Sequence, residues 1–381
     1  MKLKALLISL ILFSPSPILA RSGDHKYKDQ KVERKVPADP GVAVSICIAS
    51  GNVDVRGWDK NEVLASSDGA AQIQMKRKDS SSQSSQASRL EVLIGDKADG
   101  TGANCQGYSN VVLNVPKGAT VQVQTRDGDI NIVAVASAYA ATQNGDVNFE
   151  HVTRSIEACS LGGNVSLKDS TGRVNLSSAG GGLEATNIRP AESGDTFEAV
   201  SISGDITLRE VSHAELNART VNGNVNLAGP LALHGRYGFK TMSGDVTLSL
   251  PADASFRLVA TVAQNGEIVT DFPLTLISST TSPPRSPKGK TLAAPKEAPA
   301  AIPPVAPSPE SPEPAPAPAP TIMPEGQTVV VKVTPKVKIV RVDPVIAMAP
   351  FASRRVNAIH GSGDASITVA SFSGTVHLQK D

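Results

Sequence analysis

The sequence predicts an all-β fold, a β-solenoid built from repeats of about 20 residues and interrupted by a proline-rich disordered insertion. Three observations lead to this prediction. A short strand motif recurs through the middle of the chain, glycine and proline account for 31 and 27 of the 381 residues, and only 3% of the residues are aromatic. With so few aromatic side chains the core must be aliphatic, and stacked short strands can supply such a core.

The recurring motif is a glycine, then aspartate or asparagine, then an apolar, a small polar and a second apolar residue. Its apolar side chains point to one face of a strand, so each copy predicts a short half-buried strand that needs stacked neighbours. Successive copies start 17 (128 to 145), 18 (145 to 163), 41 (163 to 204), 19 (204 to 223) and 21 (223 to 244) residues apart. The copies are Gly128–Ile132, Gly145–Phe149, Gly163–Leu167, Gly204–Leu208, Gly223–Leu227 and Gly244–Leu248, with degenerate ones at Gly172–Leu176 and Gly182–Ala185.

The glycine and the residue after it are expected to form the corner before each strand. Glycine supplies a backbone conformation with positive φ, and the aspartate or asparagine side chain hydrogen-bonds local backbone. Because these residues repeat with the fold, they indicate structural turns, whereas a catalytic cluster would be single and irregular. The structural turn residues are Gly128, Asp129, Gly145, Asp146, Gly204, Asp205, Gly244 and Asp245.

The small polar residue of each motif points away from the core, so the repeats predict a regular polar surface. We expect this surface to bind a glycan or a surface protein. The candidate binding residues are Asn131, Asn148, Ser166, Asn175, Thr207, Asn226 and Thr247.

The residues predict neither an enzyme nor a metal or cofactor site. The six histidines lack the spacing of zinc ligands, and the serines lack the G-x-S-x-G elbow. Calcium-binding β-rolls use a nine-residue glycine-rich repeat that this chain does not have. A net charge of +1 argues against a nucleic-acid partner. A polysaccharide-active β-helix enzyme stays an alternative, because such folds carry carboxylates on their strand faces.

The first 20 residues have the order of a secretory signal peptide, with Lys2 and Lys4 before an apolar run and Ala20 at the expected cleavage site. Cleavage after Ala20 predicts a secreted, periplasmic or cell-surface protein with no transmembrane segment. The alternative is an uncleaved anchor, although the apolar run is shorter than the roughly 20 residues that span a bilayer.

Three cysteines allow one disulfide at most and leave one thiol. We expect Cys47 to pair with Cys105, because Cys159 lies in an alternating segment where it is interpreted as a small buried apolar residue. The other two pairings, and a chain with no disulfide, stay open.

Two features near the N-terminus have two interpretations each. Trp58, the only tryptophan, either packs over the open end of the solenoid or offers a stacking platform for a sugar. The three cations of Lys76–Lys78 begin an expected mobile loop, 76–88, where they are either solvated or contact an anionic surface.

Composition divides the chain into a signal peptide (1–20), a solenoid domain (42–278), a proline-rich linker (279–325) and a C-terminal β segment (326–381). The composition of the linker predicts an extended segment. Its role is open between a passive insertion, a spacer through the envelope and a docking site for a partner. Two alternating segments, 328–333 and 337–342, resemble an edge hairpin. The C-terminal segment repeats the strand motif and is expected to complete the solenoid as its last turn, with a separate position as the alternative.

Three parts of the sequence carry a resemblance to a known family: Ser50–Asp59, Val111–Ala119 and the run of Ser-Gly-Asp units. They resemble the bacterial putative-adhesin family, a domain of unknown function with a β-solenoid fold, over residues 42 to 275 and about the last 30 residues. The resemblance implies an interaction role and no catalytic residues. We therefore expect a non-enzymatic secreted or envelope protein that binds through its polar face. The alternative is a structural scaffold of the envelope that self-associates end to end.

Overall fold

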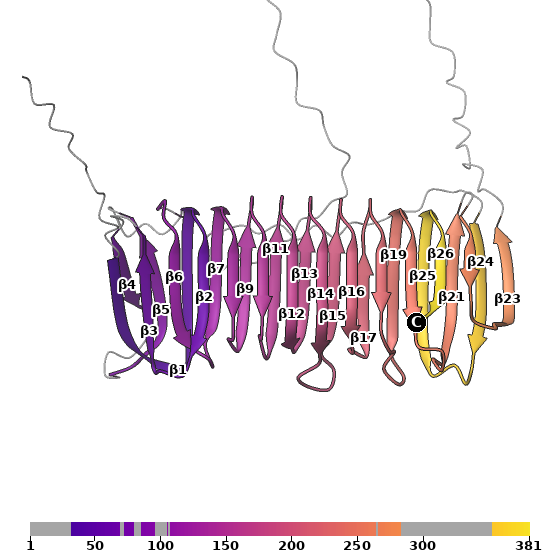
Figure 1. Ribbon diagram of the computed structural model, residues 1–381, viewed down its shortest axis with the longest axis horizontal. Helices are drawn as coiled ribbons and strands as arrows, with labels where there is room; N and C mark the ends of the chain where they lie inside the picture. Colours follow the sequence, from indigo (N-terminus) through magenta and orange to yellow (C-terminus); the bar gives the residue numbers. More distant parts are fainter. Residues whose placement is uncertain are drawn as a thin grey trace, which may run out of the picture.

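The computed structural model describes residues 32–68, 72–79, 85–95, 105, 107–263, 266–282 and 353–381. All regular structure in these residues is β, with 26 strands and no helix. The strands lie side by side along one elongated body (Figure 1), and the predicted all-β solenoid is confirmed. No helix of the described part is long and apolar enough to cross a membrane.

Each repeat of the central solenoid contains two strands, not one. The glycine motif opens a strand of one parallel sheet, and the other half of the repeat forms a strand of a second sheet that faces the first. We call them sheet A and sheet B, and one circuit through both a coil.

In spatial order, sheet A contains β3 (Glu62–Ser67), β6 (Val111–Pro116), β2 (Val53–Trp58), β8 (Ile130–Val133), β10 (Val147–Glu150), β12 (Val165–Thr171), β14 (Leu183–Arg189), β16 (Ile206–Val211), β18 (Val225–Ala228), β20 (Val246–Leu250), β26 (Val376–Lys380) and β22 (Ile268–Thr270). Sheet B contains β4 (Ile73–Arg77), β5 (Ala87–Ile94), β1 (Val32–Ser50), β7 (Thr120–Asp127), β9 (Ser137–Thr142), β11 (Ser155–Ser160), β13 (Arg173–Ser178), β15 (Thr196–Ser201), β17 (Glu215–Arg219), β19 (Arg236–Ser243), β25 (Ala365–Ser373), β21 (Phe256–Ala263), β24 (Ser353–His360) and β23 (Thr275–Ser282).

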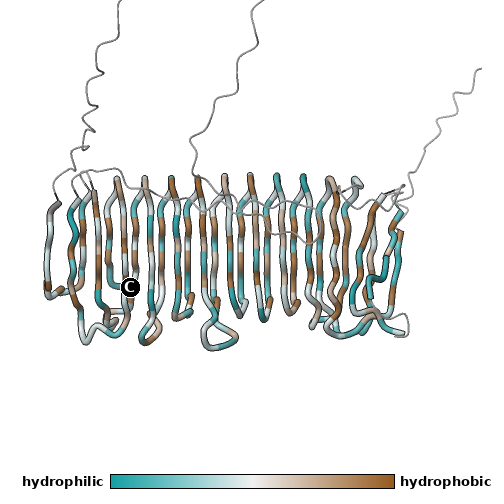
Figure 2. The backbone as a smooth tube through the Cα atoms, turned by 180° about the vertical axis from the view of Figure 1, so that it is seen from behind, coloured by the Kyte–Doolittle hydropathy of each residue, from teal (hydrophilic) through white to brown (hydrophobic). Residues whose placement is uncertain are grey.

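The core lies between the two sheets and is built from the inward-facing residues of both. Polar and apolar residues alternate along the strands (Figure 2), and the apolar positions are the buried ones. Equivalent residues of successive coils stack in register, as Ile130, Val147 and Val165 do in sheet A. Each fully buried aliphatic side chain contributes roughly 1.5 to 3 kcal/mol, so the stacking of many coils replaces the aromatic anchors that the sequence lacks.

At both ends of the solenoid the stacking order departs from the sequence order. Near the N-terminus, β1 lies between β5 and β7, and β2 lies between β6 and β8. Near the C-terminus, β25 lies between β19 and β21, and β26 lies between β20 and β22. Figure 1 shows the yellow strands β25 and β26 inserted among the orange ones. The C-terminal segment is therefore part of the solenoid, but the prediction that it forms the last turn is wrong.

The domain boundaries also differ from those expected. The solenoid begins at Val32, where the first part of β1 pairs antiparallel with β3, and not at residue 42. At the other end β23 runs through residues 279–282, which were assigned to the linker, because its antiparallel pairing with β24 extends it. The expected signal peptide, the linker from residue 283 and the segments 328–333 and 337–342 lie outside the described residues.

Candidate functional site

The glycines of the motif stack on one another at the corner where each coil passes from sheet B to sheet A. A Cβ on Gly145 would collide with the carbonyl of Gly128, and a Cβ on Gly204 with that of Gly181. The backbone φ is +148° at Gly145, but Gly204 lies outside the positive-φ region. The prediction that each motif glycine is required for a positive φ is therefore wrong at Gly204. The shared requirement is the close approach of successive coils.

The aspartate or asparagine after each glycine bonds the next coil and not its own turn. Asp129 Oδ1 accepts the backbone N–H of Asp146 at 2.9 Å, and Asp146 Oδ1 accepts that of Asn164 at 2.7 Å. Asp205 and Asp245 accept from Asn224 and Thr375 at 2.7 Å each. These side chains form a ladder along the corner. They are structural, and their partner is 17 to 19 residues away between residues 129 and 224, which the local-turn expectation missed.

A second ladder lies inside the same corner and was missed in the sequence. The buried hydroxyls of Ser160 and Ser178 donate to the glycine carbonyls of the preceding coil, at 3.3 and 3.0 Å. Thr220 and Thr241 do the same at 2.9 Å. Each of these residues stands three positions before the stacked glycine, so an S/T-x-x-G pattern was the available signal. After Ser178 that glycine is Gly181, so the degenerate copy expected from Gly182 begins one residue earlier. At Thr125 the buried hydroxyl has no partner among the described residues.

Six of the seven candidate binding residues form one row across the outer face of sheet A. The seventh, Asn175, lies on β13 in sheet B, so its assignment to the same face is wrong. Its segment, Gly172–Leu176, copies the motif locally, but it follows a strand of sheet A and therefore opens a strand of sheet B. In sheet A the place of Asn175 is taken by Glu184. From β2 to β26 the row is Asp54, Asn131, Asn148, Ser166, Glu184, Thr207, Asn226, Thr247 and His377.

The amides of this row bond one another at its N-terminal end. Asn148 Nδ2 donates to Asn131 Oδ1 at 3.0 Å, and Asn131 Nδ2 donates to Asp54 Oδ1 at 2.9 Å. Each asparagine amide has two N–H groups and an oxygen with two lone pairs, so these bonds leave at least half of its hydrogen-bonding capacity unused. The row therefore stabilises the stack and offers an ordered line of donors and acceptors at the same time.

Beside these amides the outer face of sheet A is hollowed into an open groove of about 370 Å³ that crosses β2, β8, β10 and β12. The row of amides forms one side. The next outward row forms the other, with Arg56, Glu150 and Lys168 around Val133. Charges of opposite sign alternate along this second side, so the groove has no strong net field. We call it the sheet A groove.

Trp58 and the cations of the β4–β5 hairpin make contacts with other residues of the chain. Trp58 ends β2, inside the stack and not over its open end; its indole N–H donates to Glu62 O at 2.8 Å, and Lys60 Nζ lies 4.7 Å from the ring centre. Lys78 pairs with Glu91 at 3.0 Å. Neither interpretation of Trp58 is favoured by this packing, and the loop cations are used partly within the fold.

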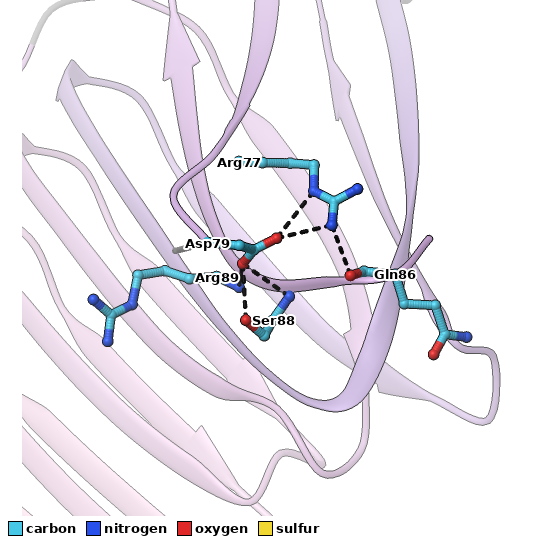
Figure 3. A network of polar contacts seen from close by, with 5 residues as sticks. All are labelled: Arg77, Asp79, Gln86, Ser88 and Arg89. Atoms are coloured by element: carbon cyan, nitrogen blue, oxygen red, sulfur yellow. Dashed lines mark hydrogen bonds and ion pairs between the residues drawn. The ribbon is translucent and has the colours of Figure 1, made fainter. Parts of the chain in front are cut away.

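Asp79 organises the hairpin between β4 and β5 (Figure 3). Its carboxylate accepts from the Ser88 hydroxyl at 2.8 Å and from the Arg89 backbone N–H at 2.7 Å, and it pairs with Arg77 at 2.9 Å. These contacts hold the pKa of Asp79 below its usual value, and the hydrogen bond from the Ser88 hydroxyl has the largest effect. Arg77 also donates to Gln86 O at 2.7 Å, so the base of the expected mobile loop is fixed.

Cys47 and Cys105 are joined by a disulfide that closes a 58-residue separation. Cys159 is free and half-buried in an outward row of sheet B, so its interpretation as a core residue is wrong, although burial raises the pKa of its thiol. His213 is fully buried; its Nε2 donates to Gly172 O at 2.8 Å, and desolvation lowers its pKa. No group of three His, Cys, Asp or Glu residues in the described part could hold a metal ion.

The two-sheet stack, the glycine corner and the polar outer row define a class of protein, a β-solenoid flattened into two facing parallel sheets. Residues 59–282, more than half of the chain, match the model of the Toastrack DUF4097 family, and the chain belongs to that family. The resemblance inferred from the sequence is thereby confirmed.

Comparison with other known proteins adds little. None of the curated proteins compared with the chain matches it. A crystal structure described as a putative cell adhesion protein from Clostridium sporogenes aligns at 9% identity and a TM-score of 0.19, covering 93% of this chain and 100% of that one. Nothing about fold or function follows from a TM-score this low.

Proposed function

We propose that the protein is a non-enzymatic binding module of the extracytoplasmic space that holds a neutral glycan in the sheet A groove. The observation that carries the proposal is the groove itself, an open hollow of about 370 Å³ beside a fixed row of amides. Sugar hydroxyls both donate and accept hydrogen bonds, and the outward half of each asparagine amide does the same.

The disulfide supports the location. A bond between Cys47 and Cys105 persists in an oxidising compartment, in agreement with the signal peptide predicted from the sequence. The disulfide and the predicted signal peptide are both compatible with an adhesin-type protein that is displayed at the cell surface or in the periplasm.

The carboxylates of the groove argue for binding over hydrolysis. Asp54 and Glu150 lie two strands apart in different rows, which places their Cα atoms on the order of 12 Å from each other. A hydrolytic pair has its two carboxyl groups facing each other across the scissile bond, roughly 5 to 9.5 Å apart, so the two side chains would have to lean toward each other from different rows. Asp54 is also bonded to Asn131, and Glu150 lies 3.3 Å from His151 Nε2.

The test is a glycan-binding screen of the full chain with two matched lysine variants. Val133→Lys places a long charged side chain in the groove, and Ala228→Lys places the same side chain in the same outward row of sheet A, away from it. We expect Val133→Lys to weaken glycan binding at least tenfold, and Ala228→Lys to leave it unchanged. No glycan bound by the unmodified chain, or equal losses in both variants, would reject the proposal.

A second function, end-to-end self-association, is favoured by one observation. Strand β23 is the edge of sheet B at the C-terminal end, it pairs only with β24 in the described part, and Leu276 and Ile277 on it are 63% and 55% exposed. An edge of this kind can pair with another copy. Sedimentation velocity should then show concentration-dependent assembly that Ile277→Lys abolishes; a monomer at every concentration excludes this function.

A further inference from the structure

The outer face of sheet B carries a group of cations at its C-terminal end that the fold itself does not use. Arg219, Lys240 and Arg355 lie in one outward row, on β17, β19 and β24, with β25 and β21 between the last two. Arg257 lies outward on β21, four residues before that row. We call these four residues and the surface between them the cationic face. None of the four side chains forms an ion pair or hydrogen bond with another described residue.

The arrangement of these cations is unfavourable for the fold alone. Arg219 lies directly opposite Lys240 on the adjacent strand. Like charges in directly opposed positions destabilise a sheet. A paired cation is available for comparison on the same face, since Arg236 binds Glu215 at 3.1 Å. Repulsion without a counter-charge in the described chain indicates that the counter-charge comes from outside.

The same row of sheet B is uncharged in the preceding coils. The residues in register with Arg219 there are Val200, Ser177 and Cys159. Acidic residues, Glu198 and Glu215, border the cationic face on that side. The positive charge is therefore concentrated on one part of the face and is not a general property of the strand motif.

The side chains between the cations are short, and most of them carry hydroxyl groups. This surface is formed by Ser366, Thr368 and Ala370 of β25 and by Val259 and Thr261 of β21. Strand spacing of about 4.8 Å places Lys240 and Arg355, three strands apart, on the order of 14 Å from each other. Because β25 separates β19 from β21, the cationic face takes this shape only when the C-terminal segment is in place.

From these observations we propose that the cationic face binds an acidic polysaccharide, a chain of sugars that carries carboxylate or sulfate groups. The cations match the acidic groups, and the serine and threonine hydroxyls match the sugar hydroxyls. Single-stranded nucleic acid needs aromatic stacking platforms, and the residues between the cations are not aromatic. A membrane surface favours large apolar side chains that insert, whereas the apolar residues between the cations are Val259 and Ala370, and the exposed Leu276 and Ile277 lie beyond β24 on β23. This surface is on the opposite sheet from the sheet A groove and is independent of it.

The experiment measures binding of the full chain to polygalacturonate at low and at physiological salt, with dextran as the uncharged counterpart. The test variant is Arg219→Gln/Lys240→Gln. Its matched control is Arg34→Gln/Lys35→Gln, which removes two adjacent exposed cations at the opposite end of the molecule. We expect the test variant to raise the Kd for polygalacturonate roughly two- to thirtyfold and to weaken its salt dependence, because two surface charge contacts are lost. The control should keep the original Kd.

Three results would overturn the proposal. They are no binding of polygalacturonate at low salt, an equal loss in the control variant, and tighter binding to duplex DNA or to phosphatidylglycerol vesicles than to polygalacturonate of equal charge. Dextran separates the two surfaces, since Val133→Lys should affect only an uncharged glycan and Arg219→Gln/Lys240→Gln only the acidic one. A failure of one binding site therefore leaves the other testable.

Discussion

At both long edges of the solenoid the chain reverses between the two sheets, but the residues that form the turns differ between the edges. Where sheet B passes into sheet A, every central coil uses the stacked glycine and most use the aspartate or asparagine after it. At the opposite edge the loops differ in length (Figure 1). There five successive coils place a residue other than glycine at positive φ: Ala134 (59°), His151 (54°), Asp169 (45°), Asn187 (56°) and Glu210 (53°). The next coil has Gly229 at the equivalent position.

This contrast explains why only one edge is visible in the sequence. At the glycine edge any Cβ would collide with a backbone carbonyl of the preceding coil, so a single residue type is possible. At the other edge the left-handed conformation costs a side chain about 1 to 2 kcal/mol, an amount that the packing of the coil can offset. A steric exclusion restricts the position to glycine in every coil, so the glycine repeats in the sequence. A small energetic penalty permits several residue types, so no repeat is visible.

The largest effect is expected from adding one methyl group at the glycine edge. Gly204→Ala should destabilise the protein by on the order of 4 kcal/mol or more, because the new Cβ collides with the Gly181 carbonyl and the coils must separate. Urea unfolding followed by circular dichroism measures the change. The control is Gly194→Ala, where φ is +96° but a Cβ has open space, so only about 1 kcal/mol is expected. Equal losses would mean that the close approach of the coils is not what selects glycine at this position.

A smaller effect is expected from the side-chain ladder at the same edge. Asp146→Ala removes the acceptor of the Asn164 N–H and should destabilise by about 0.5 to 1.5 kcal/mol, the net contribution of one hydrogen bond whose donor water can reach. Asp146→Asn should be close to neutral, because asparagine already fills equivalent places at Asn164 and Asn224 through the same Oδ1. Thermal unfolding of both variants tests this. If the asparagine variant were as unstable as the alanine one, the carboxylate charge would matter and the ladder would not.

Local features of the fold were predictable from the sequence, and non-local ones were not. The motif located the strands of sheet A and their corners because alternation and glycine are properties of neighbouring residues. It could not distinguish the sheets, so Asn175 was assigned to the wrong face. It also could not order the coils, because similar strand units fit next to one another equally well; β25 therefore lies before β21 in space and after it in sequence. The cationic face depends on that order and was invisible for the same reason.

The smallest effect, of opposite sign, is expected at the variable edge. Glu210→Gly should stabilise the protein by about 0.5 to 1 kcal/mol, because relief of the left-handed penalty exceeds the entropy that glycine adds to the unfolded chain. Glu198→Gly is the matched control, since it makes the same change inside β15, where glycine should destabilise by a similar amount. Denaturant midpoints of the two variants should move in opposite directions. A loss of stability in both would show that the conformation of Glu210 carries no penalty here, and that the glycine at the equivalent position of the next coil, Gly229, is not selected by backbone conformation.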